Sequence, residues 1–324
     1  MDEGWGDGLP LIPPTVERVR AFLAEGGRYP DELIATLPPM QTECTVEKIV
    51  INAVMAGAPP ETLPLLCAAV EAIADPRFDI GGLNATTGSV VPLLVVNGPI
   101  RDVFDIPYQH GCFGGAATLA NAAARTLRLL MRNIGGQQLG VSSESVFGNP
   151  GRIAGIMMGE WEERSPWKPL AERRGVPGNA VTVYGAMGTM NILDITSHSG
   201  PEFLESIGRS LAYPGCNNFS PAVAFGEAMV AINPVWAEII GRDVPDIADV
   251  QEMIWRHASL PLDAFQKRLA DSIVAAGRVQ ADGRVYLTPT PDDVLVYVCG
   301  GTGSLHAHGV HSWGTCLSAT KAVR

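Results

Sequence analysis

Positive charge is scarce in this chain of 324 residues. Only 23 Lys and Arg residues stand against 34 Asp and Glu residues, so the formal net charge is -11 and the isoelectric point is about 5.0. Proteins that bind the phosphate backbone of DNA or RNA need clustered Lys and Arg. We therefore expect no nucleic-acid partner.

Long apolar runs are also lacking, since no stretch approaches the roughly 18 residues that a membrane-spanning helix needs. The N-terminal residues, MDEGWGDG, have neither the basic start nor the apolar centre of a signal peptide. These features predict a cytoplasmic protein with no membrane partner.

Motifs of metal ribbons, disulfide frameworks and nucleotide sites are missing as well. The six cysteines include no CxxC motif and no close pair, which indicates free thiols. The glycine-rich stretch HGCFGGAAT at 110–118 is not GxGxxG, and it lacks the GK[ST] of a Walker loop. We therefore predict no nucleotide cofactor.

The patterns that are present predict an α/β fold with a mixed or mostly parallel sheet flanked by helices. Residues 90–96, VVPLLVV, and 228–232, AMVAI, are apolar runs of strand length, typical of strands buried on both faces. Residues 152–158 are predicted to form a further strand. Asp31 is a suitable N-cap for a short helix that ends near Leu37.

The domain organisation that we expect is simple. Residues 1–14 are polar and rich in Gly and Pro, which is typical of an arm that packs on a neighbouring subunit of a homo-oligomer. Residues 15–324 then form one α/β catalytic unit, and any boundary between two lobes would lie near 140–180.

The stretch 43–57, ECTVEKIVINAVMAG, is apolar at helical spacing but carries three functional polar side chains. Lys48 and Asn52 lie four residues apart on one face, and Glu47 lies in the first turn, where the helix dipole favours an anion. One interpretation is a solvated polar stripe. The other is a helix that faces a cleft, where Glu47 is an acid or base, Lys48 stabilises charge and Asn52 binds substrate.

Two loops offer further candidates. Asn97 follows the first apolar run, at the end of a strand where open α/β sheets bind ligands. Gly114 and Gly115 precede a long Ala-rich helix, where backbone N–H groups attract carboxylate or phosphate. His110 and Cys112 could act there as a base and a thiol, although a His and a Cys two residues apart in a loop are more often unrelated.

A glycine loop that ends at Ser304 leads into three closely spaced histidines, His306, His308 and His311. Ser304 is a candidate substrate contact. An HxH pair followed by a third His can supply imidazole ligands to zinc or another divalent metal. The alternatives are a polar loop without a ligand and a site that binds substrate without metal.

Several segments resemble one bacterial family. TVEKIVINAVMAG at 45–57, VVNGPI at 95–100 and NIGG at 133–136 are similar to UGSC-family (seleno)proteins, which are also labelled thiol-disulfide oxidoreductases. The resemblance extends from about residue 25 to Trp313. It implies thiol-linked chemistry with a Cys- or Sec-bearing module, but this chain contains no UGSC sequence and has Ala58 where family members carry Cys. A separate partner protein would then supply that group.

The sequence as a whole favours an enzyme that acts on a small polar or anionic molecule. We expect lyase or hydrolase-like bond cleavage by acid–base chemistry, without a nucleotide cofactor. The alternatives are a thiol-linked oxidoreductase, a non-catalytic subunit that docks the Cys- or Sec-bearing partner, and a metal-dependent enzyme that uses the histidine cluster.

Overall fold

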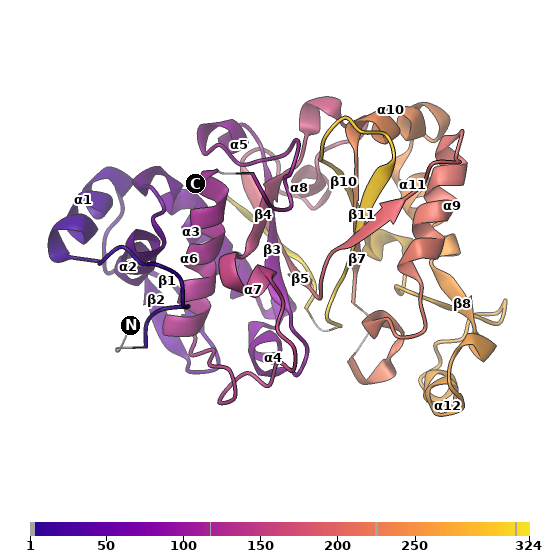
Figure 1. Ribbon diagram of the computed structural model, residues 1–324, viewed down its shortest axis with the longest axis horizontal. Helices are drawn as coiled ribbons and strands as arrows, with labels where there is room; N and C mark the ends of the chain where they lie inside the picture. The colour runs from indigo at the N-terminus through magenta and orange to yellow at the C-terminus, as the bar shows by residue number, and fades with distance from the viewer. Residues whose placement is uncertain (1–3, 117, 224–225, 315) are drawn as a thin grey trace. The chain divides into compact units, whose positions relative to one another are not determined.

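The computed structural model describes residues 4–116, 118–223, 226–314 and 316–324 (Figure 1). The described residues form two compact units. Unit 1 comprises those of Met1–Gly159, Ala171–Gly185 and Ser318–Arg324, and unit 2 comprises Glu160–Leu170 and those of Ala186–Leu317. The chain passes from unit 1 to unit 2 after Gly159, returns at Ala171 and passes to unit 2 again after Gly185. The expected arm, 1–14, is described from Gly4 onward.

Unit 1 is built on a four-stranded sheet whose order is β12-β5-β3-β4. The strands are β12 (Ala319–Ala322), β5 (Ala180–Ala186, which ends one residue beyond the unit), β3 (Val91–Asn97) and β4 (Ile156–Gly159). β3 and β4 are parallel, whereas β12 and β5 are antiparallel. Every residue of β3 is buried, as the first apolar run predicts. The sheet is thus mixed and flanked by helices, which confirms the predicted α/β class.

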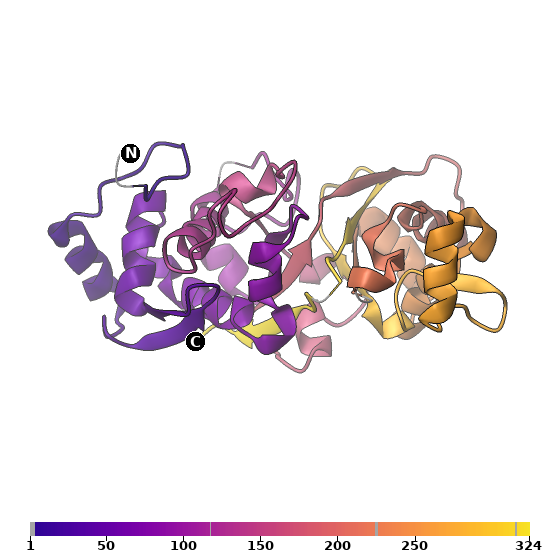
Figure 2. The same cartoon turned by 90° about the horizontal axis from the view of Figure 1, so that it is seen from below.

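Helices cover this sheet in two layers. α3 (Leu63–Ile73) packs against β12, α6 (Leu119–Asn133) packs against β4, and α2 (Val46–Ala56) packs on α6. The N-terminal segment lies along α2, where the Ile12 amide donates to the Met55 carbonyl at 3.1 Å (Figure 2). The shorter or outer helices are α1 (Val16–Gly26), α4 (Ile80–Ala85), α5 (Ile100–Val103), α7 (Gly151–Ala154) and α8 (Leu170–Arg173), of which α8 crosses the unit boundary.

The helix predicted from Asp31 to Leu37 is wrong. These residues lead into β1 (Leu33–Leu37), which pairs with β2 (Thr42–Thr45) in an antiparallel hairpin. A segment of this length with β-branched side chains gains more from pairing with a neighbouring strand than from one isolated helical turn.

The strand predicted at 152–158 is wrong in its first half. Residues 151–154 form α7 instead, because the Asn149 side chain accepts a hydrogen bond from the Gly151 amide at 2.9 Å and starts the turn. Gly155, with φ of 74°, ends the helix and leads directly into β4.

Unit 2 contains a second four-stranded sheet, with the order β10-β7-β11-β6. β10 and β7 are parallel, and β11 is antiparallel to both of its neighbours, β7 and β6. A separate antiparallel pair is formed by β8 and β9. The strands are β6 (Met190–Leu193), β7 (Ala228–Ile232), β8 (Ser259–Pro261), β9 (Arg284–Tyr286), β10 (Val294–Val298) and β11 (His306–His311).

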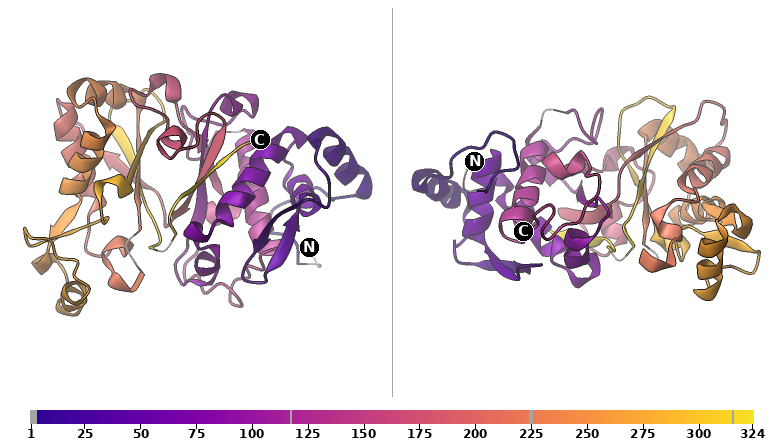
Figure 3. Two further views of the ribbon diagram at one scale, coloured as in Figure 1. Left: turned by 180° about the vertical axis from the view of Figure 1, so that it is seen from behind. Right: turned by 60° about the horizontal axis from the view of Figure 1, so that its bottom comes forward.

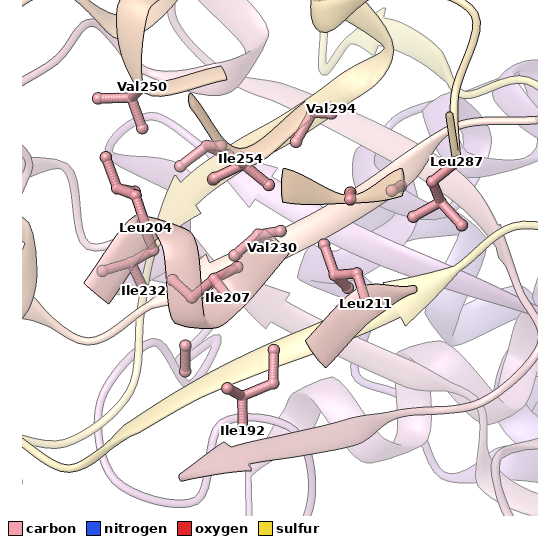
Figure 4. Close-up of a cluster of buried hydrophobic side chains, with 14 of the residues drawn as sticks. Ile192, Leu204, Ile207, Leu211, Val230, Ile232, Val250, Ile254, Leu287 and Val294 are labelled. Carbon is pink, nitrogen blue, oxygen red and sulfur yellow. The ribbon is translucent and has the colours of Figure 1, made fainter. Parts of the chain in front are cut away.

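The core of unit 2 lies between its sheet and a layer of helices (Figure 3). The helices of this layer are α9 (Gly200–Leu211), α10 (Pro234–Asp243) and α11 (Ile247–His257), while α12 (Lys267–Ala275) lies beyond β8 and adds Ile273 to the core (Figure 1). Figure 4 shows Leu204, Ile207 and Ile254 from these helices directed at Val230 and Ile232 of β7. In the described parts of both units, no helix combines the length and the apolar character that a membrane span requires.

Two valines provide a matched test of this core. Val250 of α11 is 0% exposed, whereas Val274 of α12 is 54% exposed. Val250→Ala should lower the free energy of unfolding by about 2 kcal/mol, because it removes buried methyl groups and leaves a cavity. Val274→Ala should change it by less than about 0.5 kcal/mol. Urea unfolding followed by circular dichroism measures both, and equal effects would contradict the packing described here.

Candidate functional site

Unit 1 contains a cavity of about 520 Å³ beside the C-terminal half of α6. Small-molecule sites in proteins usually measure about 300 to 1,000 Å³, so this volume suits a small ligand. The lining comes from the N-terminal segment, α6, the loop after α6, and α7. The residues are Asp7, Arg128, Arg132, Gln137, Leu139, Phe147, Gly148, Asn149, Pro150, Arg152 and Ile153.

Three arginines contribute most of the cavity's hydrogen-bond donors. Arg128 and Arg132 lie four residues apart on one face of α6, and Arg152 comes from α7. The Nε of Arg132 and both Nε and Nη1 of Arg152 are buried, with no hydrogen-bond partner in the part of the chain that the structure describes. Leaving buried charged donors without acceptors is costly, so these groups favour a ligand that supplies acceptor oxygens.

A chain of buried amides fixes the guanidinium of Arg128, which is 8% exposed. Its Nη2 donates to Gln137 Oε1 at 2.6 Å, and Gln137 Nε2 donates to Asn84 Oδ1 at 2.8 Å. Asn84 Nδ2 in turn donates to the Pro38 carbonyl at 2.9 Å. Arg128 Nε also donates to the Arg152 carbonyl at 3.2 Å, which links α6 to α7.

The charges at the cavity are unbalanced. Burial and the neighbouring charge of Arg152 lower the pKa of Arg128 to about 9, and burial lowers the pKa of Arg152. Arginine stays protonated at neutral pH, so two positive charges lie close together. The lining carboxylate, Asp7, is bound by Arg125, whose Nε and Nη2 each donate to it at 2.8 Å. Within the described residues, no acid pairs with Arg128, Arg132 or Arg152.

This arrangement can bind an anion, since guanidinium groups form strong charge-assisted hydrogen bonds with carboxylate and phosphate. Sequence reasoning missed it, although one signal was available. Arg125, Arg128 and Arg132 recur at intervals of three and four along α6, which places them on one side of the helix. No sequence spacing marks Arg152 in this way, because it reaches the cavity through the loop between α6 and α7.

The predicted residues of α2 do not line this cavity. Glu47 is exposed, and Lys48 Nζ donates to the Glu43 carbonyl at 2.6 Å, in strand β2 just before its own helix. Asn52 is 2% exposed, donates to the Lys48 carbonyl at 2.8 Å and accepts from Asn133 Nδ2 at 2.7 Å. The polar stripe is therefore divided between a solvated part and a buried contact with α6.

The two predicted loops also lie outside the cavity lining. Asn97 is the last residue of β3 and is 1% exposed. His110, Gly114 and Gly115 are exposed, whereas Cys112 is 5% exposed. The glycines precede the first residue of α6, Leu119, by several positions, so they do not form the start of the helix; Ala117 lies outside the described residues.

The three histidines of unit 2 lie on β11 and not in a loop. Because strand side chains alternate, His306 and His308 share one face, while His311 points to the other face and binds the Leu211 carbonyl through Nε2 at 2.8 Å. The structure therefore does not bring all three together. Among the described residues, no group of three or more His, Cys, Asp or Glu is placed to hold a metal ion. Ser304 is exposed in the preceding turn.

Neither protein-family models nor curated proteins give a match to this chain. The resemblance to UGSC-family proteins therefore stays a prediction from the sequence, as do the Cys- or Sec-bearing partner and the homo-oligomer. The cavity and its arginines are the features on which a functional proposal can rest.

The contact between Asp7 and Arg125 makes the N-terminal segment sensitive to acid. Burial raises the pKa of Asp7, but hydrogen bonds from Arg125 and the Leu9 amide outweigh it and hold the pKa below its usual value. Such a carboxyl adds stability above the pKa of the unfolded chain, and this contribution is lost as the pH falls through the lower, folded value. We expect the segment to detach from α6 below about pH 4.

Hydrogen exchange can follow this detachment at the Ile12 amide, after correction for the intrinsic exchange rate. Protection of Ile12 should fall on acidification, while protection of Val95 in the buried strand β3 should persist. Asp7→Asn should lower the protection of Ile12 already at neutral pH. Full protection of Ile12 in Asp7→Asn would show that the ion pair does not hold the segment.

Proposed function

We propose that this protein binds a small organic anion in the arginine-lined cavity of unit 1. The observation that carries the proposal is the set of buried N–H groups on Arg132 and Arg152 that have no acceptor among the described residues. A carboxylate or phosphate would accept from both guanidiniums and would offset the repulsion between Arg152 and Arg128. Arg128, held by Gln137, supplies a fixed positive charge at the same place.

A purely structural role explains only part of this arrangement. Arg132 lies in the last turn of α6, where a cation interacts favourably with the helix dipole and the terminal carbonyls. This explanation does not extend to Arg128, which is buried one turn earlier, or to Arg152, which belongs to another helix. Structural arginines in protein interiors are normally paired with carboxylates. Arg125 and Asp7 show that pattern beside the same cavity.

The cavity supports a binding step more directly than a chemical step. Asp7, its lining carboxylate, is already bound by Arg125, and Glu47 does not line the cavity. Lyase or hydrolase-like cleavage with Glu47 as acid or base, thiol-linked redox chemistry and metal-dependent catalysis all stay predictions from the sequence. A lyase or hydrolase that acts on a small anion and a non-catalytic protein that carries one would both need such a binding site.

Arg152→Met tests the proposal, because it removes the charge and the two free donors but retains much of the side-chain length. The wild-type protein should be stabilised against heat by at least one of acetate, phenylacetate, inorganic phosphate and phenyl phosphate, relative to chloride at equal ionic strength. Arg152→Met should weaken that binding by about 10-fold to 100-fold, as expected for charge-assisted hydrogen bonds. Titration calorimetry gives the affinities.

The ligand-free Arg152→Met protein should be as stable as the wild type, or more stable, because a buried unpaired charge has been removed. Arg20→Met on the exposed side of α1 is the matched control and should leave anion binding unchanged. If none of the four anions binds, or if both variants lose affinity equally, the arginine cavity is not an anion site.

A further inference from the structure

Part of the cavity lining is apolar. Leu139, Phe147, Pro150 and Ile153 line it. Phe147 is 96% exposed, Leu139 is 68% exposed and Ile153 is 51% exposed. A monomeric protein rarely gathers large apolar side chains in solvent without a use for them, and such a group commonly marks a binding surface.

The backbone around Phe147 is anchored, although its ring is not. On one side, the Val146 amide donates to the Thr87 carbonyl at 3.1 Å. On the other side, Gly148 has φ of 77°, and the Asn149 side chain accepts from the Gly151 amide at 2.9 Å. The loop therefore holds an aromatic ring at the rim of the cavity, where a ligand can cover it without unfolding the loop.

We infer that the anion bound here is amphipathic, with a carboxylate or phosphate head on Arg132 and Arg152 and an aromatic or aliphatic body against Phe147, Leu139 and Ile153. This inference rests on the proposed function and adds the chemical class of the ligand. Arg152 and Ile153 are consecutive residues that both line the cavity, so a short molecule can meet the charged and the apolar groups at once.

The position of the apolar residues favours a small molecule over a protein partner. A protein interface would need a broad surface, of about 800 Å² on each side. Here the exposed ring and aliphatic groups line the same cavity of about 520 Å³ as Arg128, Arg132 and Arg152. A ligand that carried only charge would leave this apolar lining uncovered.

The test compares two anionic heads, each with and without a phenyl group: acetate with phenylacetate, and inorganic phosphate with phenyl phosphate. Within at least one pair, the phenyl compound should bind at least about tenfold more tightly, because it buries apolar surface against Phe147. Phe147→Ala should remove most of this difference, because it should lower the affinity for the phenyl compound far more than the affinity for the bare head. Since Phe147 is 96% exposed, the variant is expected to fold.

Tyr29→Ala is the matched control, because Tyr29 is also an aromatic residue of unit 1, is 80% exposed and does not line the cavity. It should leave the phenyl preference intact. If bare and phenyl anions bind equally while Arg152→Met still abolishes binding, the cavity is an anion site but the ligand is not amphipathic. The inference also fails if Phe147→Ala changes the oligomeric state, measured by light scattering, and not the phenyl preference.

Discussion

The constraint on which this part of the protein depends is the proximity of two guanidinium groups, those of Arg128 and Arg152, neither of which is paired with a carboxylate among the described residues. Burial, and after it the neighbouring charge of Arg152, lower the pKa of Arg128 to about 9, so the two guanidinium groups repel each other. The folded chain tolerates this repulsion because Gln137 and the Arg152 carbonyl accept hydrogen bonds from Arg128. Such an arrangement stabilises the fold less than an ion pair or an apolar packing would, and it is readily explained if a bound anion completes it.

The buried amides give that explanation a structural basis. The connection from Arg128 through Gln137 and Asn84 to the Pro38 carbonyl joins α6, the loop after it, α4 and the end of β1. A fully hydrogen-bonded network in the interior favours one arrangement of these elements. The position of the fixed charge is therefore set before any ligand arrives, which lowers the cost of ordering the site on binding.

The fold could be predicted from the sequence where local pattern and burial agree. The fully buried strands β3 and β7 follow directly from their apolar runs. The prediction failed for β1, because its conformation is decided by pairing with β2 and not by its own residues. The polar loop expected around the histidines is a strand for the same reason: pairing with β7 and β6 forms β11 and places His311 on the other face from His306 and His308.

The candidate site was harder to predict, because its residues have ordinary local surroundings. An arginine on an amphipathic helix usually reaches solvent, whereas here the packing of the loop and α7 on α6 buries Arg128 and leaves Arg152 half-buried. Helix α2 does not line the cavity but packs on α6, which does. Its Asn52 accepts a hydrogen bond from Asn133, the residue next to Arg132, so α2 helps to fix the end of α6 that carries the arginines. The segment with the most distinctive sequence therefore contacts the helix that lines the cavity and does not line the cavity itself.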